Sequence, residues 1–149
     1  MKPLPHQYEA SLSGGPAGHA VLAADGLPNL PTAPPVDFGG PGDAWSPEHM
    51  LLGSVATCFL FTFRAVARAS QLPFERVEAT VSGTVDRVDG VTRFTEIVLR
   101  PRLLVDAGID RVRAIRVMER SERACLVSQS LQTPIRLEPE VVVAEAAAV

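Results

Sequence analysis

The sequence contains few aromatic residues: phenylalanine, tyrosine and tryptophan together make up 5% of its 149 residues. A hydrophobic core must therefore be built mainly from valine, leucine, isoleucine and alanine. The chain also lacks an excess of positive charge, since its formal net charge is −3 at pH 7. We expect no nucleic-acid partner, because such partners usually require a basic face. With 46% hydrophobic and 21% charged residues, the composition is that of a globular protein, most economically a single domain over residues 1–149.

The chain also lacks a recognisable leader and a long apolar run. Residues 1–6 contain no apolar segment of the kind that signal sequences carry. The longest uncharged apolar stretch, residues 50–63, is shorter than the about 20 residues that a bilayer-spanning helix needs. We therefore expect a cytoplasmic protein with no membrane partner. Cytosolic thiols are kept reduced, so Cys58 and Cys125 are expected to be either inert core residues or a functional pair rather than a structural disulfide.

The N-terminal third predicts a hairpin followed by an irregular connection. Residues 7–12 would pair with residues 19–23 across a turn at Gly14-Gly15-Pro16. Residues 26–43 contain five prolines and four glycines, a composition typical of a segment without regular secondary structure.

The start of a long helix is well marked at Ser46. Serine is a favoured N-cap residue, Pro47 suits the first helical position, and Glu48 suits the positive end of the helix dipole. From Met50 onward the sequence is apolar on nearly every side, and Pro73 ends the run. A helix that is apolar all round is a buried helix, but about five strands in one chain would cover only one face of it. We therefore expect a homodimer, in which a second copy covers the other face.

The second half of the chain predicts a hairpin, two helices and a final strand. Residues 77–86 and 92–103 alternate between apolar and polar positions, and Asp89-Gly90 between them is a strong turn sequence. The helices are predicted over residues 106–122 and 125–131, with the apolar side of the first formed by Ile109, Val112, Ile115 and Met118, and the last strand is predicted over residues 135–143. The expected fold class is α+β, with antiparallel sheet hairpins around a long buried central helix.

The two cysteines leave two interpretations open. A free cysteine in a helix is often a small core hydrophobe, and this describes Cys58 as well as any function does. Cys125 lies near the start of a short predicted helix, where backbone N–H groups stabilise a thiolate. An apolar thiol paired with one at a helix start is typical of peroxide reduction followed by disulfide formation.

Glu48 is a candidate for the same site only if two chains are involved. It precedes Cys58 by ten residues, which is about 15 Å along a straight helix. The two side chains cannot meet within one helix, so Glu48 would have to reach the thiol from an antiparallel partner helix. The alternative is an exposed first-turn carboxylate that only favours the helix dipole.

Two stretches of the sequence resemble the OsmC/Ohr family, the osmotically inducible and organic hydroperoxide resistance proteins. The first is Ser46-Pro47-Glu48, followed by a helix that reaches Ala56-Thr57-Cys58-Phe59; the family pattern is Asn/Ser-Pro-Glu, eight or nine helical residues, then Ala-Cys-Phe. The second is Cys125-Leu126-Val127-Ser128-Gln129-Ser130-Leu131, which is similar to the family's Cys-Pro-Val-Ser-x-x-Leu. The expected order of hairpins and helices also resembles that of the family along nearly the whole chain.

This resemblance implies an intertwined homodimer with two active sites at its interface, and thiol-dependent reduction of organic hydroperoxides. By position, Cys58 would be the peroxidatic thiol, Cys125 the resolving thiol and Glu48 the carboxylate that positions the site. Apolar neighbours such as Phe59 and Phe63 would favour fatty or aromatic substrates. The resemblance further implies no bound cofactor or metal, and an external dithiol of the lipoyl type as the reductant.

In members of the family, an arginine follows a Gly-Gly pair in the first hairpin and lowers the pKa of the reactive thiol. This sequence departs from that pattern. Here Pro16 follows Gly14-Gly15, and no arginine precedes Arg64. Thiolate stabilisation would then come from Arg64, from His19 or from local dipoles.

Two alternatives to a peroxidase remain open. One is a degenerate family member that binds a small apolar ligand or senses oxidants with little turnover, as the missing arginine suggests. The other is a metal site formed by Cys58, Cys125 and one of His6, His19 or His49, although the sequence has no CxxC or HxxxH spacing.

Overall fold

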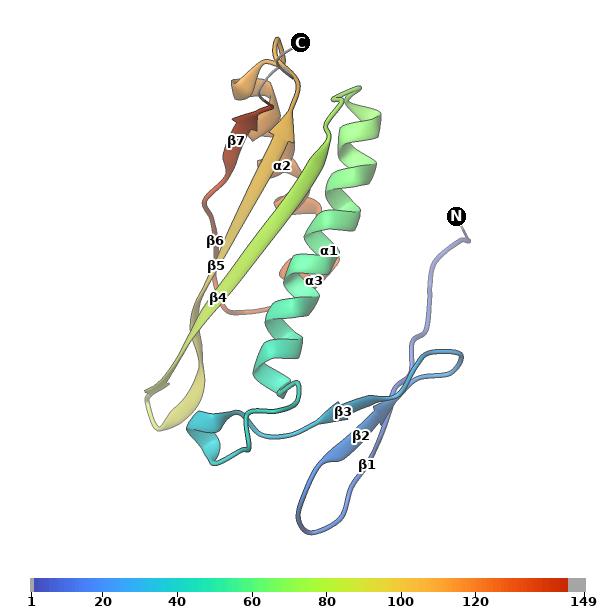
Figure 1. The fold of residues 1–149 in the computed structure, drawn as a ribbon, viewed down its shortest axis with the longest axis vertical. Helices are drawn as coiled ribbons and strands as arrows, with labels where there is room; N and C mark the ends of the chain where they lie inside the picture. Colours follow the sequence, from blue (N-terminus) through green and yellow to red (C-terminus); the bar gives the residue numbers. More distant parts are fainter. Residues whose placement is uncertain (1, 145–149) are drawn as a thin grey trace. The chain divides into compact units, whose positions relative to one another are not determined.

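The computed structural model describes residues 2–144, and the chain divides between Leu51 and Leu52 into two compact units. We call them the N-terminal unit, up to Leu51, and the C-terminal unit, from Leu52 (Figure 1). The single domain expected over residues 1–149 stays a prediction.

The N-terminal unit contains a three-stranded antiparallel sheet in the order β1-β2-β3. The predicted hairpin is present, but its first strand is shorter: β1 (Ser11–Ser13) pairs with β2 (Ala20–Ala23). The prediction of an irregular segment over residues 26–43 is wrong in part, because β3 (Leu30–Thr32) pairs with β2, and a short 3-10 helix, η1 (Val36–Phe38), follows. The proline-rich composition concealed β3. An edge strand tolerates Pro31, since its missing N–H weakens no interior ladder.

The long helix α1 (Pro47–Ala69) begins as the sequence predicts. The Ser46 hydroxyl accepts a hydrogen bond from the His49 backbone N–H at 3.2 Å, and the Ser46 carbonyl accepts one from Met50 at 2.9 Å. The Ser46 hydroxyl also lies 2.7 Å from His49 Nδ1. Ser46 is fully buried, so these contacts satisfy a polar side chain and the free end of the helix together.

The C-terminal unit contains a four-stranded sheet built on one long hairpin. β4 (Arg76–Val88) and β5 (Val91–Val105) are antiparallel, and the turn residues Asp89 and Gly90 have φ of 52° and 77°, as a two-residue hairpin turn requires. The last predicted strand is two strands, β6 (Ile135–Leu137) and β7 (Glu140–Val143), each parallel to β5. Glu138 and Pro139 separate them.

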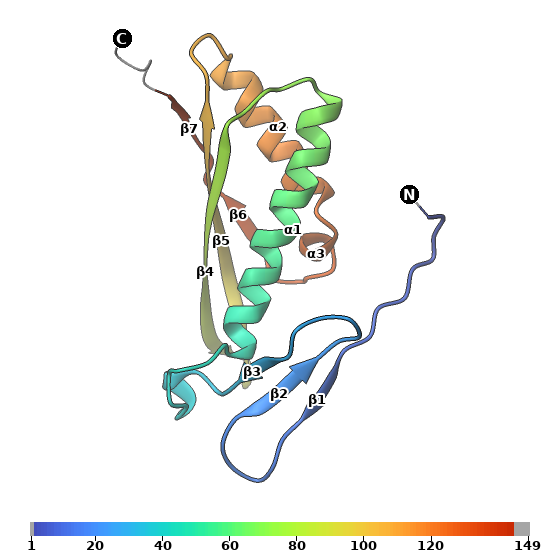
Figure 2. The ribbon, with the colours of Figure 1, turned by 45° about the vertical axis from the view of Figure 1, so that its right-hand side comes forward.

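Helices cover one face of this sheet (Figure 2). On α1 a stripe spaced four residues apart is buried, and it packs against inward residues of β5 and against α2 (Arg111–Ala124). These core residues are Val55, Phe59, Phe63, Ala67, Leu99, Leu103, Val105, Ala114, Val117 and Met118. The predicted alternation of β5 is therefore confirmed at Leu99 and Leu103.

The prediction for α2 is wrong at its start, and on its apolar side it is wrong only at Val112, since Ile109, Ile115 and Met118 pack in or against the core. The helix begins at Arg111, and the Asp110 carboxylate caps it by accepting from Val112 N–H at 2.9 Å and Arg113 N–H at 3.3 Å. Gly108 has φ of 96°, which breaks any helix starting at Asp106. Val112 lies in the first turn of the helix and is 57% exposed.

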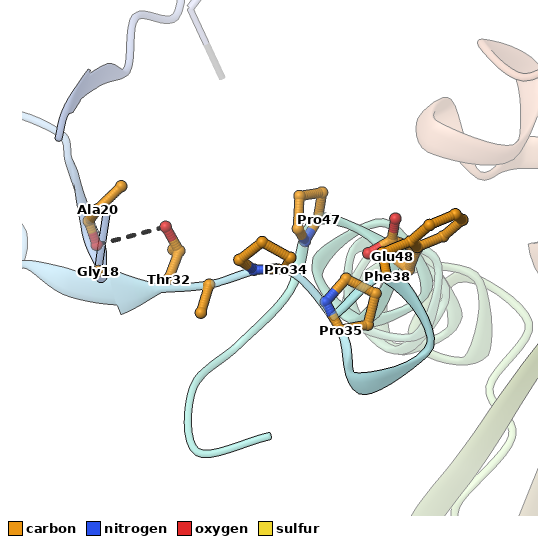
Figure 3. Close-up of a pocket in the computed structure, with 9 residues that line it drawn as sticks. Gly18, Ala20, Thr32, Pro34, Pro35, Phe38, Pro47 and Glu48 are labelled. Carbon is orange, nitrogen blue, oxygen red and sulfur yellow. Dashed lines mark hydrogen bonds between the residues drawn. The ribbon is translucent and has the colours of Figure 1, made fainter. Parts of the chain in front are cut away.

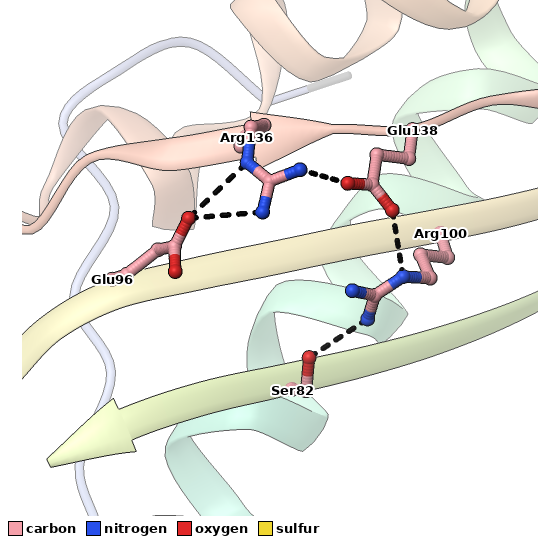
Figure 4. A network of polar contacts seen from close by, with 5 residues as sticks. All are labelled: Ser82, Glu96, Arg100, Arg136 and Glu138. Atoms are coloured by element: carbon pink, nitrogen blue, oxygen red, sulfur yellow. Dashed lines mark hydrogen bonds and ion pairs between the residues drawn. The ribbon is translucent and has the colours of Figure 1, made fainter.

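The opposite face of the sheet carries paired charges (Figure 4). Arg136 contacts Glu96 at 3.0 Å and also pairs with Glu138, while Arg100 contacts Glu138 at 2.7 Å and Ser82 at 2.8 Å. All of these side chains are well exposed to solvent, so each pair contributes little to stability. Because these side chains are charged and exposed, this face of the sheet is the one in contact with solvent.

The helix α1 was expected to be buried on every side, and within the described chain it is not. Outside its buried stripe, Phe61 is 60% exposed, with the Arg64 guanidinium 5.5 Å from the centre of its ring. By length and composition alone the helix could also cross a membrane, with a mean hydropathy of 1.7 over 18 residues. Its buried stripe instead packs on the sheet as a core helix does.

Candidate active site

The C-terminal unit brings Cys58 and Cys125 together. Cys58 lies in the middle of α1 and is partly exposed, whereas Cys125 is fully buried; neither is in a disulfide. The Cys125 thiol lies near enough to Cys58 to act on its pKa. Sixty-seven positions of sequence separate them, so this proximity is a product of the fold.

Cys125 occupies the joint between two helices. It ends α2, donating its backbone N–H to the Glu122 carbonyl at 3.0 Å, and it is the N-cap of α3 (Leu126–Gln129), accepting from the Gln129 N–H at 3.0 Å. Its backbone is extended, with φ of −68° and ψ of 116°. The first N–H groups of α3 therefore have no partner within that helix and are free to donate elsewhere.

Those donors act on Cys58. Burial raises the pKa of the Cys58 thiol, but hydrogen bonds outweigh it and leave the pKa below its ordinary value. The donors, in order of effect, are the Cys125 thiol, the Val127 N–H, the Thr62 hydroxyl and the Leu126 N–H. All four favour the thiolate, because they donate to the charged sulfur.

Cys125 is affected in the opposite direction. Burial is the main cause that raises the pKa of its thiol, and the hydrogen bond to Cys58 raises it further, against a smaller opposing effect of Ser128. The sequence predicted that the start of α3 would stabilise a thiolate at Cys125; Ser128 of α3 does lower the pKa of Cys125 through its backbone and side chain, but burial outweighs it. The N–H groups of Leu126 and Val127 lower the pKa of Cys58, while the pKa of the buried Cys125 thiol is raised overall.

Glu48, the third predicted residue, lies in the first turn of α1, in the N-terminal unit. It lines a cavity of about 290 Å³ together with Phe38, Pro34, Pro35 and Pro47 (Figure 3). The alternative prediction of an exposed first-turn carboxylate describes it only in part, because Glu48 is partly exposed while its Oε2 is buried. The described chain does not bring Glu48 to Cys58, since ten residues of helix separate them.

The proposed substitutes for the missing arginine are engaged elsewhere. Arg64 lies over the Phe61 ring, and His19 Nε2 lies 2.7 Å from Asp43. Among residues 2–144, no arginine is among the groups that lower the pKa of Cys58. Local dipoles, the remaining prediction, are present as the Val127 and Leu126 N–H groups, and the Cys125 thiol and the Thr62 hydroxyl, which were not predicted, act with them.

Two other expectations about the site need correction. Phe59 and Phe63 are fully buried in the core, so they do not present an apolar surface to a substrate. In the described part of the chain, no three His, Cys, Asp or Glu side chains are grouped so that they could hold a metal ion. The histidines instead contact other groups, for example His6 the Lys2 carbonyl and His49 the Ser46 hydroxyl.

Sequence reasoning missed Thr62 and the two amides at the start of α3. Thr62 follows Cys58 by four residues on α1, the spacing that places two side chains on one helix face. That spacing could have identified Thr62. No local pattern could have assigned Leu126 and Val127 to a thiol on another helix.

The architecture resembles that of several solved OsmC-type structures. An organic hydroperoxide resistance protein OsmC from Legionella pneumophila, also described as a predicted redox protein, superimposes with a TM-score of 0.75 at 24% identity, over 95% of this chain and 100% of that one. An OsmC-like protein of unknown function from Vibrio cholerae gives a TM-score of 0.82 at 14% identity, over 91% and 99%. The chain is thus an α+β protein with the OsmC-like fold.

Sequence comparison assigns the family. The model of the OsmC-like protein family matches residues 40–140. The uncharacterized protein YmaD of Bacillus subtilis (strain 168) is 32% identical over 109 residues, which are 71% of this chain and 73% of YmaD. This chain belongs to the OsmC-like protein family, and the resemblance predicted from its two cysteine motifs is confirmed.

Proposed function

We propose that this protein reduces organic hydroperoxides with Cys58 as the peroxidatic thiol and Cys125 as the resolving thiol. The observation that carries this proposal is the asymmetry of the pair: Cys58 is partly exposed with a lowered pKa, and Cys125 is buried with a raised pKa. The thiolate is the nucleophilic form of cysteine, so the accessible member of the pair is also the reactive one. The Legionella relative, named for organic hydroperoxide resistance, supports the same substrate class.

In the first step, the Cys58 thiolate attacks the terminal oxygen of the hydroperoxide. A sulfur–oxygen bond forms and the oxygen–oxygen bond breaks, which leaves Cys58 as a sulfenic acid, and the alkoxide takes up a proton to become an alcohol. The α3 amides and the Thr62 hydroxyl hold the thiolate before the attack.

In the second step, the Cys125 sulfur attacks the Cys58 sulfenic acid, forming a disulfide and releasing water. The effect of the Cys125 thiol on the pKa of Cys58 supports this step, because it requires the two thiols to be near each other. An external dithiol, which the resemblance suggests is of the lipoyl type, then reduces the disulfide by exchange and is itself oxidised to a disulfide.

The proposal includes a homodimer in the cytoplasm. A second copy would cover the apolar side of α1 around Phe61, which the single chain leaves exposed. An antiparallel second α1 would also carry its own Glu48 towards Cys58. Glu48 and Cys58 of the same helix cannot meet, because they are about 15 Å apart along it.

A second candidate function is ligand binding or oxidant sensing with little turnover. The absence of an arginine from the groups that lower the pKa of Cys58 in residues 2–144 favours it. The two functions differ in rate, because a sensor needs one oxidation event and a peroxidase needs rapid, repeated ones.

The test is to treat the reduced protein with one equivalent of cumene hydroperoxide and map its thiols by mass spectrometry. A Cys58–Cys125 disulfide formed within seconds, with release of cumyl alcohol, supports the peroxidase. The Cys58→Ser variant should show no turnover, and Cys125→Ser should accumulate a sulfenic acid that dimedone captures. Slow oxidation of both thiols without a defined disulfide would contradict the peroxidase and favour the sensor.

A further inference from the structure

One buried serine beside the cysteine pair has a hydroxyl without a partner. Ser128 lies in α3 and is 8% exposed, and within the described part of the chain its Oγ makes no hydrogen bond. Two neighbouring serines behave differently. The Ser121 hydroxyl donates to the Val117 carbonyl at 2.6 Å. The Ser130 hydroxyl donates to the Leu126 carbonyl at 2.8 Å, so both use the carbonyl four residues earlier, as serines in helices commonly do.

The backbone of Cys125 explains why Ser128 lacks that partner. The carbonyl four residues before Ser128 belongs to Ala124, the last residue of α2. Between them Cys125 interrupts the helix with an extended backbone, at ψ of 116°. The Ala124 carbonyl is therefore not presented to Ser128 as it would be in a continuous helix. A buried hydroxyl without a partner is unfavourable, so this donor is retained at a cost in stability.

The group near this hydroxyl is the Cys125 thiol. Cys125 is the N-cap of α3 and Ser128 is the third residue of that helix, the spacing at which an N-cap side chain meets its helix. The N–H and the hydroxyl of Ser128 both lower the pKa of the Cys125 thiol, although burial and Cys58 outweigh them. Cys125 is fully buried, so bulk water does not supply the donor that Ser128 carries.

We propose that the Ser128 hydroxyl is the hydrogen-bond donor to the Cys125 sulfur whenever that sulfur carries negative charge. This deepens the proposed function and rests on it, because the resolving thiol becomes charged at two points of the cycle. The first is its attack on the Cys58 sulfenic acid, whose hydroxyl leaves as water with the proton that Cys125 loses. The second is reduction, in which the external dithiol attacks the more accessible Cys58 sulfur, the disulfide breaks and the Cys125 thiolate leaves.

Such a donor favours the reacting state over the resting one. The sulfur of a neutral thiol is a weak acceptor, and the Ser128 hydroxyl makes no hydrogen bond in the reduced chain. A thiolate is a stronger acceptor, so the hydrogen bond forms as charge develops on Cys125. Ser128 keeps its own proton throughout and forms no bond to either sulfur.

The test follows the reduced full chain after one equivalent of cumene hydroperoxide. In Ser128→Ala, formation of the Cys58–Cys125 disulfide should slow about tenfold at pH 7 relative to release of cumyl alcohol, and dimedone should capture more Cys58 sulfenic acid. The defect should shrink as the pH is raised, because Cys125 then loses its proton without the donor. Cys58, the titratable group that acts on Cys125, is already oxidised in this step. A purely structural role of Ser128 would give the same defect at every pH.

Three further variants separate the hydroxyl from the packing around it. Ser128→Thr and Ser128→Val have the same shape and differ in the hydroxyl, so any packing cost is common to both. The threonine variant should form the disulfide faster than the valine variant. Ser121→Ala is the matched control, because it removes a buried hydroxyl whose partner is a carbonyl and which acts on the pKa of neither cysteine. It should leave the ratio of the two rates unchanged.

Reduction provides a second measurement that needs no hydroperoxide. A disulfide made with diamide should be reduced by dithiothreitol more slowly in Ser128→Val than in Ser128→Thr. Equal rates in these two variants, in both measurements, would overturn the inference, and so would a Ser128→Ala defect that persists at every pH. Rapid disulfide formation with the same ratio in every variant would sink the inference alone. An unsubstituted protein that forms no disulfide with cumene hydroperoxide, while the diamide-made disulfides show the expected order, would sink the peroxidase alone.

Discussion

The Thr62 hydroxyl oxygen lies 4.0 Å from the Cys58 sulfur, one turn further along α1. A side chain on the same helix thus joins two amides and a thiol from the α3 region in stabilising one thiolate. The site needs no cation for this effect, because several neutral donors converge on the sulfur.

Replacing Thr62 by valine should therefore reduce the reactivity of Cys58. Valine keeps the branched shape but donates no hydrogen bond, so the pKa of the Cys58 thiol rises. We expect iodoacetamide to alkylate Cys58 about threefold more slowly at pH 7, the size of effect typical of one hydrogen bond. Thr57→Val is the control, since the Thr57 hydroxyl donates to the Gly53 carbonyl at 2.9 Å on the same helix. Equal rates in the two variants would contradict the assignment.

The second prediction concerns pH. Because the pKa of Cys58 is lowered and that of Cys125 is raised, an increase in pH should produce the Cys58 thiolate first. Cys125→Ala removes a donor to that thiolate, so the alkylation curve of Cys58 should move to higher pH, and Cys125→Ser, which keeps a donor, should move it less. Peptide mass spectrometry across a pH series measures both curves. A curve that Cys125→Ala leaves in place would rule out the thiol–thiol hydrogen bond.

The third prediction concerns the start of α1. Ser46→Ala removes the hydroxyl that accepts the His49 N–H, and the buried site offers no water in exchange. The loss should be about 1 kcal/mol in the free energy of unfolding. Urea denaturation measures it, with Ser11→Ala on an exposed strand as the control, for which the change should be close to zero.

The fourth prediction separates the two sides of α1. Phe59 is fully buried and Phe61 is 60% exposed, so Phe59→Ala should cost about 3–5 kcal/mol of unfolding free energy and Phe61→Ala much less. In the proposed homodimer, Phe61→Glu should instead dissociate the dimer, and its circular dichroism spectrum should match that of the unsubstituted protein because the variant still folds. Val112→Glu on the exposed side of α2 is the control. Sedimentation velocity that shows the same assembly for both variants would place the interface elsewhere.

Where local chemistry decides the structure, the sequence is a sufficient guide. The start of α1 follows from Ser46 and Pro47, and the β4–β5 turn from Asp89 and Gly90, because each depends on neighbouring residues alone. The third strand of the N-terminal sheet was missed because proline-rich segments favour loops, and only pairing with β2 makes β3 a strand. The start of α2 was placed too early because its apolar periodicity extends back through Ile109, across Gly108.

The residues of the site could be predicted from the sequence, but the directions of their pKa shifts could not. Cys58 and Cys125 were identified by their motifs, and their proximity is a tertiary fact that no spacing contains. The directions of the pKa shifts depend on burial, which raises the pKa of Cys125, and on the Val127 and Leu126 amides, which lower that of Cys58 from another helix; helix-start reasoning took neither into account. The buried Oε2 of Glu48 likewise depends on how residues 34–38 fold over the first turn of α1.

The position of Cys125 between α2 and α3 connects the reacting side chain to the ends of two helices. One residue there holds the last turn of α2 through Glu122 and the only turn of α3 through Gln129. The proposed disulfide would therefore form at a residue whose backbone ends one helix and starts the next. Amide exchange at Cys125 and Gln129 should then differ between the reduced and the oxidised protein.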